Sequence, residues 1–244
     1  EILLIMLLGA MDVIMLSQYS DNAVAAVGVD TQILNMVFIV FEVFTAGTMV
    51  LCARYRGARE ERDMTRVIGI SLLFNGLAGL AVSLMLVFAA EPILAVMGIR
   101  PALMPDAATY MRIVGGFAFL QGLSLTISAV LRSLEMAACP MFVTLLVNIL
   151  NMAGNYTLIF GHFGAPALGV TGAAISTSLC RGVALLILAY ILHRKGVRFP
   201  SAWFRPFPFD KARELLNIGL PAAGEFFSYQ FSQIVITFFI NKLG

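Results

Sequence analysis

Seven long apolar segments alternate with short polar connections along the chain. Each is about 20 residues long, the length that an α-helix needs to cross the hydrocarbon core of a bilayer. Because hydrocarbon satisfies no free backbone groups, and the segments lack the alternating pattern of barrel strands, we expect membrane-spanning helices. The predicted spans are residues 2–19, 27–52, 67–90, 107–131, 140–160, 168–192 and 215–240.

Composition agrees with this pattern. Of the 244 residues, 60% are hydrophobic and 12% are charged, whereas soluble domains contain about 25% charged residues. The fold class that we expect is therefore an all-α membrane protein, a polytopic helical bundle. The chain begins at Glu1 inside an apolar run, without the basic region or cleavage site of a signal peptide, and stops at Gly244 where the seventh span closes. We expect a fragment of a longer, transporter-sized protein.

Positive charge predicts the orientation in the membrane. The connections 53–66, 132–139 and 193–213, with the residues at their edges, hold 12 of the 16 Lys and Arg. The positive-inside rule places these loops and the N-terminus in the cytoplasm, and the protein in the cell (plasma) membrane as a multi-pass protein. A net charge of +2 in this distribution gives no indication of nucleic-acid binding.

Catalytic and metal-binding patterns are absent from the sequence. Cys52, Cys139 and Cys180 are far apart, and His162 and His193 stand alone, so no zinc or redox spacing exists. We expect no cofactor and no enzymatic activity. An intramembrane enzyme would need paired carboxylates or a His–Glu–metal set at one depth, and no such set is present.

Polar residues within the spans are the candidate functional groups. Intramembrane ionisable side chains usually face a bundle interior or a water-filled cavity, and the clear cases are Asp12, Glu42 and Arg181. Asn148, Asn151 and Asn155 recur at spacings of three and four, so a helix aligns them on one face. Buried amides also serve as packing contacts between helices. That interpretation is favoured for Asn148 and stays open for the other two.

Depth groups four of these residues. At 1.5 Å per residue, Asp12, Asn151, Asn155 and Thr177 lie about 8 to 14 Å below the outer ends of their spans. They therefore share one layer in the outer half of the membrane. Glu42 belongs nearer the cytoplasmic side.

Several segments together resemble the multidrug and toxic-compound extrusion (MATE) family. They include AMDVIMLSQYSDNAVAAVG, AVLRSLEMAACPMF, NILNMAGNYTLIFG and LGVTGAAISTS, which occur in the family's order. The resemblance implies one half of a twelve-helix transporter. Residues 1–192 would form the N-terminal six-helix lobe, with its first helix truncated; 193–213 the cytoplasmic loop between lobes; and 214–244 the truncated first helix of the C-terminal lobe.

The resemblance also implies a function and a site. Such transporters are secondary antiporters that export organic cations and drugs in exchange for protons or sodium ions. The family's cation site in this lobe matches Asp12, Asn151, Asn155 and Thr177. Branches with an acid on span 5 carry Asp at the position of Asn155.

The sodium-coupled branch carries Glu on span 7, where this chain has Tyr229, with Glu225 one turn earlier. These departures leave the coupling ion open. Glu42, Arg181, Glu225 and Tyr229 are candidate cavity or substrate residues.

The expected partners are small amphipathic or cationic organic substrates and membrane lipids, and we expect the full-length protein to be a monomer. An alternative function within the same superfamily is a flippase for lipid-linked oligosaccharides or polysaccharides. It requires a strongly cationic cavity, and Arg181 is the one basic residue that the predicted spans offer to it.

Overall fold

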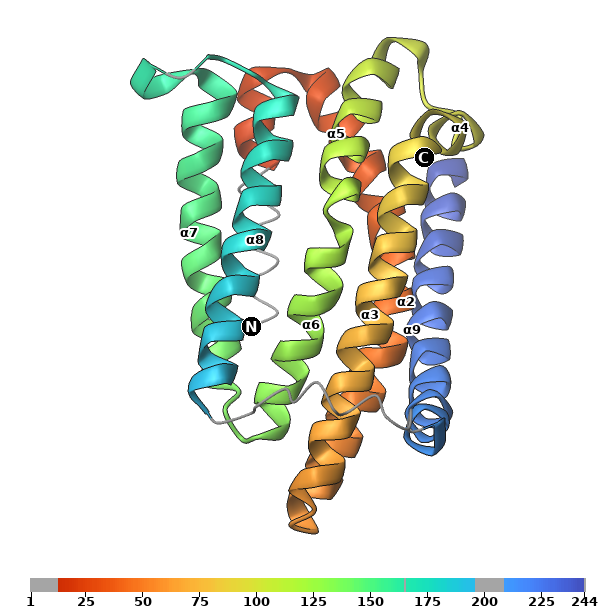
Figure 1. Ribbon diagram of the computed structural model, residues 1–244. Helices are drawn as coiled ribbons and strands as arrows, with labels where there is room; N and C mark the ends of the chain where they lie inside the picture. Colours follow the sequence, from red (N-terminus) through yellow and green to blue (C-terminus); the bar gives the residue numbers. More distant parts are fainter. Residues whose placement is uncertain (1–12, 165, 196–208, 244) are drawn as a thin grey trace.

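A computed structural model describes residues 13–164, 166–195 and 209–243, and this part of the chain consists of helices and short connections (Figure 1). A helical segment at 13–19 precedes the labelled elements. The labelled elements are α2 Asp21–Gly57, α3 Glu61–Phe88, α4 Ala90–Val96, η1 Pro101–Leu103, α5 Met104–Gly116, α6 Ala118–Ser133, α7 Ala138–Phe160, η2 His162–Gly164, α8 Val170–Arg194 and α9 Phe209–Leu243.

The helices confirm the expected fold class. Four of them, α2, α3, α7 and α8, are long and apolar enough to cross a membrane, and α5 with α6 makes a fifth span if this bent pair is counted as one. Most of the predicted span 2–19 lies outside the described residues. The predicted span 215–240 lies within α9, which is not among these candidate spans.

The fourth span is not the continuous helix that its apolar run predicts. It is bent by 45° between α5 and α6. At the bend, Gly115 lies so close to α3 that an added Cβ would stand 2.7 Å from the Cβ of Leu86. The backbone N–H of Phe119, just after the break, donates to the hydroxyl of Ser83 on α3 at 3.3 Å. A polar side chain of the neighbouring helix thus satisfies a backbone group that the bend frees.

Two hydrophobic clusters form the interior, one toward each end of the bundle. The first includes Leu86, Leu94 and Met111, and the second includes Leu51, Ile68 and Leu192. Buried polar contacts join α2, α3 and α6 near the junction of the clusters. There the amide of Asn75 donates to the hydroxyls of Thr126 at 2.6 Å and Thr45 at 3.4 Å.

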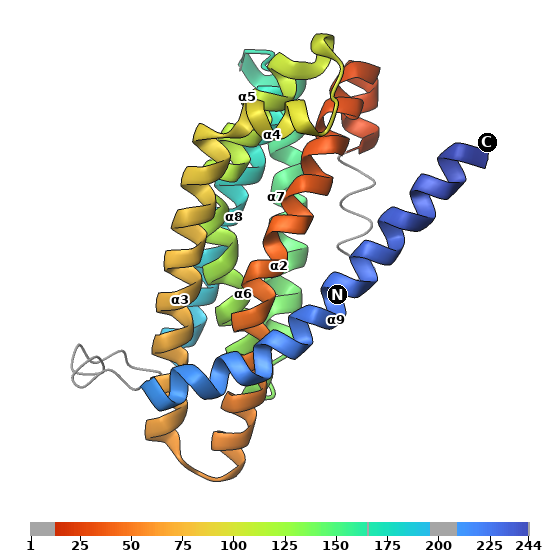
Figure 2. The same ribbon diagram turned by 90° about the vertical axis from the view of Figure 1, so that its right-hand side faces the viewer.

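Helix α9 crosses α2 in close contact and then leaves the bundle (Figure 2). Glycine permits this approach on both helices. A Cβ on Gly47 of α2 would stand 2.5 Å from the backbone oxygen of Leu215, and a Cβ on Gly219 of α9 would collide with the backbone oxygen of Val43. The first half of the seventh predicted span is therefore attached directly to the preceding bundle.

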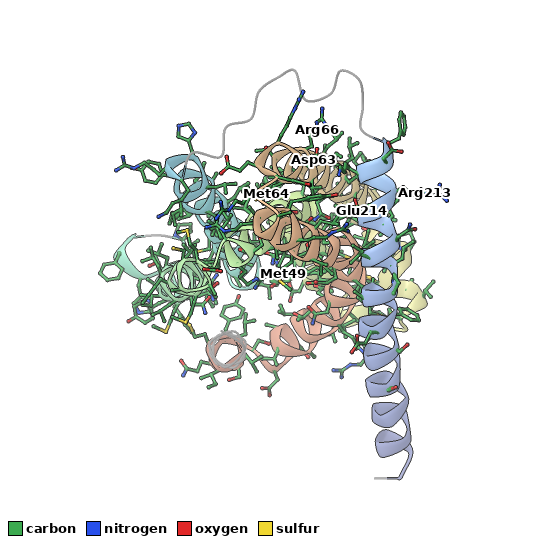
Figure 3. The ribbon with its side chains drawn as sticks, turned by 90° about the horizontal axis from the view of Figure 1, so that it is seen from below. Met49, Asp63, Met64, Arg66, Arg213 and Glu214 are labelled. Atoms are coloured by element: carbon green, nitrogen blue, oxygen red, sulfur yellow. The ribbon has the colours of Figure 1, made fainter. Side chains whose placement is uncertain are left out.

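Charged and polar side chains also connect α9 to α2 and α3 at one end of the bundle, which we call the basic end. It holds the α2–α3 turn, the α6–α7 turn and the start of α9 (Figures 1 and 3). Glu214 of α9 forms an ion pair with Arg54 at 2.8 Å and accepts a hydrogen bond from the hydroxyl of Tyr55 at 2.7 Å. Lys211 donates to the same hydroxyl at 2.6 Å and pairs with Asp63 at 3.1 Å.

Candidate functional site

A cavity of about 560 Å³ lies between the helices, with walls from residues 13–19 and from α2, α5, α6, α7 and α8. Its size falls in the range of small-molecule sites, and its wall is mainly apolar, as such sites usually are. Polar groups are placed on several sides of it. They belong to Thr31, Asn35, Tyr110, Gln121, Ser124, Ser128, Arg132, Thr144, Asn148, Asn151, Asn155, Thr177 and Arg181.

A layer of amides and hydroxyls connects α7 to α8 at the cavity wall. The Nδ2 group of Asn151 donates to the hydroxyls of Ser176 at 3.4 Å and Thr177 at 3.3 Å. The amide of Asn155 donates to the side-chain oxygen of Asn151 at 3.2 Å. The hydroxyl of Ser176 donates to the backbone oxygen of Asn151 at 3.2 Å. Gly154 makes room for this contact, because a Cβ there would collide with the Ser176 hydroxyl.

The structure thus brings together three of the four residues expected to share a layer, namely Asn151, Asn155 and Thr177. Asn151 is 4% exposed and Asn155 is 2% exposed, so their amides need these partners. Asn148 lies on the same face and also lines the cavity, as the helical spacing predicts. Asp12, the fourth residue, lies outside the described residues.

The remaining candidates are dispersed. Glu42 is half-buried on α2 but is not among the residues that line the cavity. Glu225 is exposed on α9, away from the cavity lining, and the side chain of Tyr229 lies outside the described residues. Only Arg181 of this second group contributes to the described cavity wall.

Two arginines reach the cavity. Arg181 of α8 donates to the backbone oxygen of Val114 at 3.4 Å, and its guanidinium lies over the ring of Phe38, 5.3 Å from the centroid. Arg132, which the sequence places in a loop, is the penultimate residue of α6 and also lines the cavity. It interacts electrostatically with Glu42. The charge count alone could not show that this loop arginine turns inward.

Sequence reasoning missed Asp30. Its side chain is completely buried on α2, and neither carboxylate oxygen has a hydrogen-bond partner in the structure. A buried polar group without a partner is rare in folded proteins. The residue lies only one turn inside the predicted start of its span, where a carboxylate is easily assigned to the membrane boundary. The available signal was the position of this aspartate inside the predicted span 27–52.

The arrangement can hold an organic molecule and an ion side by side. The apolar wall accommodates hydrophobic groups, while the side-chain oxygens of Asn151 and Thr177 are ligands of the kind that hard cations prefer. In transporters, substrate and coupling-ion sites commonly lie near the membrane midplane at helix interfaces.

Comparison with known proteins assigns the chain to a family. The model of the MatE family matches residues 1–157. The chain belongs to the MatE family. It is 43% identical over its whole length to an uncharacterized transporter, YisQ, of Bacillus subtilis, covering 54% of that protein. It is 29% identical over 98% of its length to a probable multidrug resistance protein, NorM, of Thermotoga maritima, covering 51% of that protein.

Solved structures show the same fold. A MOP superfamily transporter from Pyrococcus furiosus matches 99% of this MatE chain with a TM-score of 0.85 at 24% identity, over 52% of its own length. The outward-facing structure of a multidrug resistance MATE family transporter matches with the same TM-score and coverage. The chain therefore spans about half the length of the curated relatives and solved structures that it matches.

Proposed function

We propose that this chain provides the first lobe of a secondary antiporter that exports small amphipathic or cationic organic compounds in exchange for protons or sodium ions. The observation that carries the proposal is the layer of Asn151, Asn155 and Thr177 on the wall of a largely apolar cavity. Membership of the MatE family and relatives named as multidrug resistance proteins support it. The second lobe supplies the opposing half that alternating access requires.

Asp12 is the coupling residue in this proposal. It exchanges a proton as the cavity alternates between sides, or it binds sodium through its carboxylate while Asn151 and Thr177 complete an oxygen shell. The structure supports the part of this shell formed by α7 and α8, whose side chains are already in mutual contact.

The test uses the full-length protein in cells that lack other drug pumps. Ethidium efflux is measured with the proton and sodium gradients imposed separately. Asp12→Asn removes the charge but keeps the shape, so gradient-driven efflux should be lost while expression persists. Asn151→Ala should reduce efflux at least about tenfold, because it removes the side-chain hydrogen bonds from α7 to Ser176 and Thr177 of α8. Asn217→Ala, an exposed asparagine on α9, is the matched control. Wild-type efflux by Asp12→Asn, with unchanged pH and sodium dependence, would contradict the assignment.

A flippase for lipid-linked saccharides is the second candidate, and one observation favours it. Arg132 joins Arg181 at the cavity wall, which makes the described cavity more cationic than the sequence indicates. The two functions are separated by assaying the full-length protein in vesicles with ethidium and with a fluorescent lipid-linked saccharide. Gradient-dependent ethidium transport without translocation of the lipid supports the antiporter, and the reverse result supports the flippase.

A further inference from the structure

We infer that Arg181 forms a binding subsite for an oxyanion, a carboxylate or phosphate group, on an amphipathic substrate. This inference rests on the proposed function, since it concerns the same cavity, and it narrows the substrate class. The preferred substrates then carry an acidic group beside their hydrophobic part, so that they are zwitterionic or anionic and not simple organic cations.

The described cavity wall carries an excess of positive charge. The cavity lining within the described residues contains Arg132 and Arg181 and no aspartate or glutamate. Arg132 interacts electrostatically with Glu42 of α2. For Arg181, the described residues provide no carboxylate within ion-pair distance. Its guanidinium contacts the Val114 backbone oxygen and the Phe38 ring, and it interacts electrostatically with Tyr110, which also lines the cavity. A guanidinium inside a membrane bundle normally pairs with an opposite charge.

The guanidinium of Arg181 has donors available for an oxyanion. It has five N–H donors in a planar fork that matches the two oxygens of a carboxylate or phosphate. A single hydrogen bond to Val114 at 3.4 Å uses one of them. The Phe38 ring on α2 and the Val114 carbonyl on α5 hold the group from two sides, so that its orientation is restricted before a ligand arrives. Restricting a binding group in advance lowers the entropy lost on binding.

Arg181 lies close to the amide and hydroxyl layer along α8. Thr177 lies one turn before it and Ala184 lies three residues after it, and both line the cavity. A ligand at Arg181 therefore lies one helical turn from the amide and hydroxyl layer. An acidic group at Arg181 and a cation at that layer can occupy the cavity together.

The test compares two probes that differ only at one acidic group. Rhodamine B has a free carboxylate, and in its ethyl ester that group is capped; both keep the same cationic ring system. Equilibrium binding is measured by fluorescence anisotropy with the purified full-length protein in phosphatidylcholine nanodiscs. We expect wild-type protein to bind the acid at least about tenfold more tightly than the ester. Arg181→Gln should remove this preference by weakening binding of the acid, with little change for the ester.

Controls separate a binding role from a structural one. Arg112→Gln is the matched substitution, because Arg112 is exposed and pairs with Glu91 outside the cavity. It should leave the preference intact. Ala184→Glu keeps Arg181 but places a carboxylate one turn away on the same helix face, where it can neutralise the guanidinium. It should reduce the preference, whereas Ala184→Gln should not. This pair decides the question if Arg181→Gln does not fold.

Repeating the measurement with phosphatidylglycerol in the nanodiscs identifies the source of the oxyanion. Competition by this lipid against rhodamine B, abolished by Arg181→Gln, assigns the subsite to a lipid headgroup. Unchanged binding assigns it to a soluble organic acid. An acid preference that survives both Arg181→Gln and Ala184→Glu overturns the inference, and so does a wild-type protein that binds neither probe. A wild-type protein that shows the acid preference but moves no ethidium under either gradient would overturn the proposed function and leave the subsite supported.

Discussion

Asp30 is the least explained residue of the interior. It is completely buried on α2, and among the described residues neither of its oxygens has a hydrogen-bond partner. Burying a polar group without a compensating hydrogen bond is unfavourable. Leucine has the same number of side-chain heavy atoms as aspartate, so it fills the same space without the polar oxygens.

We therefore expect Asp30→Leu to raise the free energy of unfolding of the full-length protein by about 1–3 kcal/mol. Thermal unfolding of the purified protein, followed by intrinsic fluorescence, measures the change. As a comparison, Asp106→Leu should lower the free energy of unfolding. Asp106 is exposed in the first turn of α5 and interacts favourably with the helix dipole. A lower midpoint for Asp30→Leu would show that the carboxyl makes a stabilising interaction in the folded protein.

Individual residues show which part of the site was predictable. The contact between Asn151 and Asn155 follows from their spacing of four on one helix, and Thr177 was matched through the family resemblance. Arg132 was not predictable in the same way. It lies at the last turn of α6, and whether such a residue faces solvent or a cavity depends on how far the helix extends and how the bundle packs around it.

Among the elements, two features were not predicted from the sequence: the break between α5 and α6, and the attachment of α9 to the bundle. The residues around Phe117 form an unbroken apolar run, so hydropathy predicts one straight span. The bend instead reflects the close approach of Gly115 to Leu86 on another helix. Contacts between segments distant in the sequence also decide where α9 lies. By contrast, the existence of the apolar helices follows directly from the length and hydropathy of their segments.

Tyr55 is the centre of the contact between α9 and the bundle at the basic end, because its hydroxyl donates to Glu214 and accepts from Lys211. Burial acts to lower the pKa of Lys211, but its hydrogen bonds to Tyr55 and Asp63 outweigh this and raise the pKa above its ordinary value. A raised pKa means that this stabilisation is fully present at neutral pH and is lost only as the pH rises through the pKa of the folded protein.

Tyr55→Phe should therefore weaken the attachment of α9 by about 1–2 kcal/mol. Hydrogen exchange of the backbone amides in the first turns of α9 should accelerate at neutral pH. Tyr190→Phe, an exposed tyrosine on α8, controls for the loss of a hydroxyl. Equal exchange rates in wild type and Tyr55→Phe would show that the ion pairs and the glycine contacts hold the helix without the Tyr55 hydroxyl.

At the scale of the whole molecule, the connections alternate between two ends of the bundle (Figure 1). The α2–α3 turn lies at the basic end, and the α7–α8 connection lies at the opposite end. We propose that the basic end faces the cytoplasm, as the distribution of Lys and Arg indicates.

Labelling of single cysteines in intact cells tests the orientation. In a full-length protein without Cys52, Cys139 and Cys180, an impermeant maleimide should label Gly164→Cys but not Glu60→Cys. Both positions are exposed, so the difference reports the side of the membrane. Permeabilised cells provide the control, in which both cysteines should react. Labelling of Glu60→Cys in intact cells would reverse the assignment.

The two hydrophobic clusters lie toward opposite ends of the same bundle, with the first containing Leu94 and the second containing Leu192. The two clusters consist of different buried residues with different partly buried hydrophobic residues packed against them, and substitutions at distant, independent sites usually have additive effects on stability. Each end can therefore accumulate sequence changes without compensation at the other. Homologues of this lobe are expected to diverge in two separate groups of covarying core positions, one for each side of the membrane.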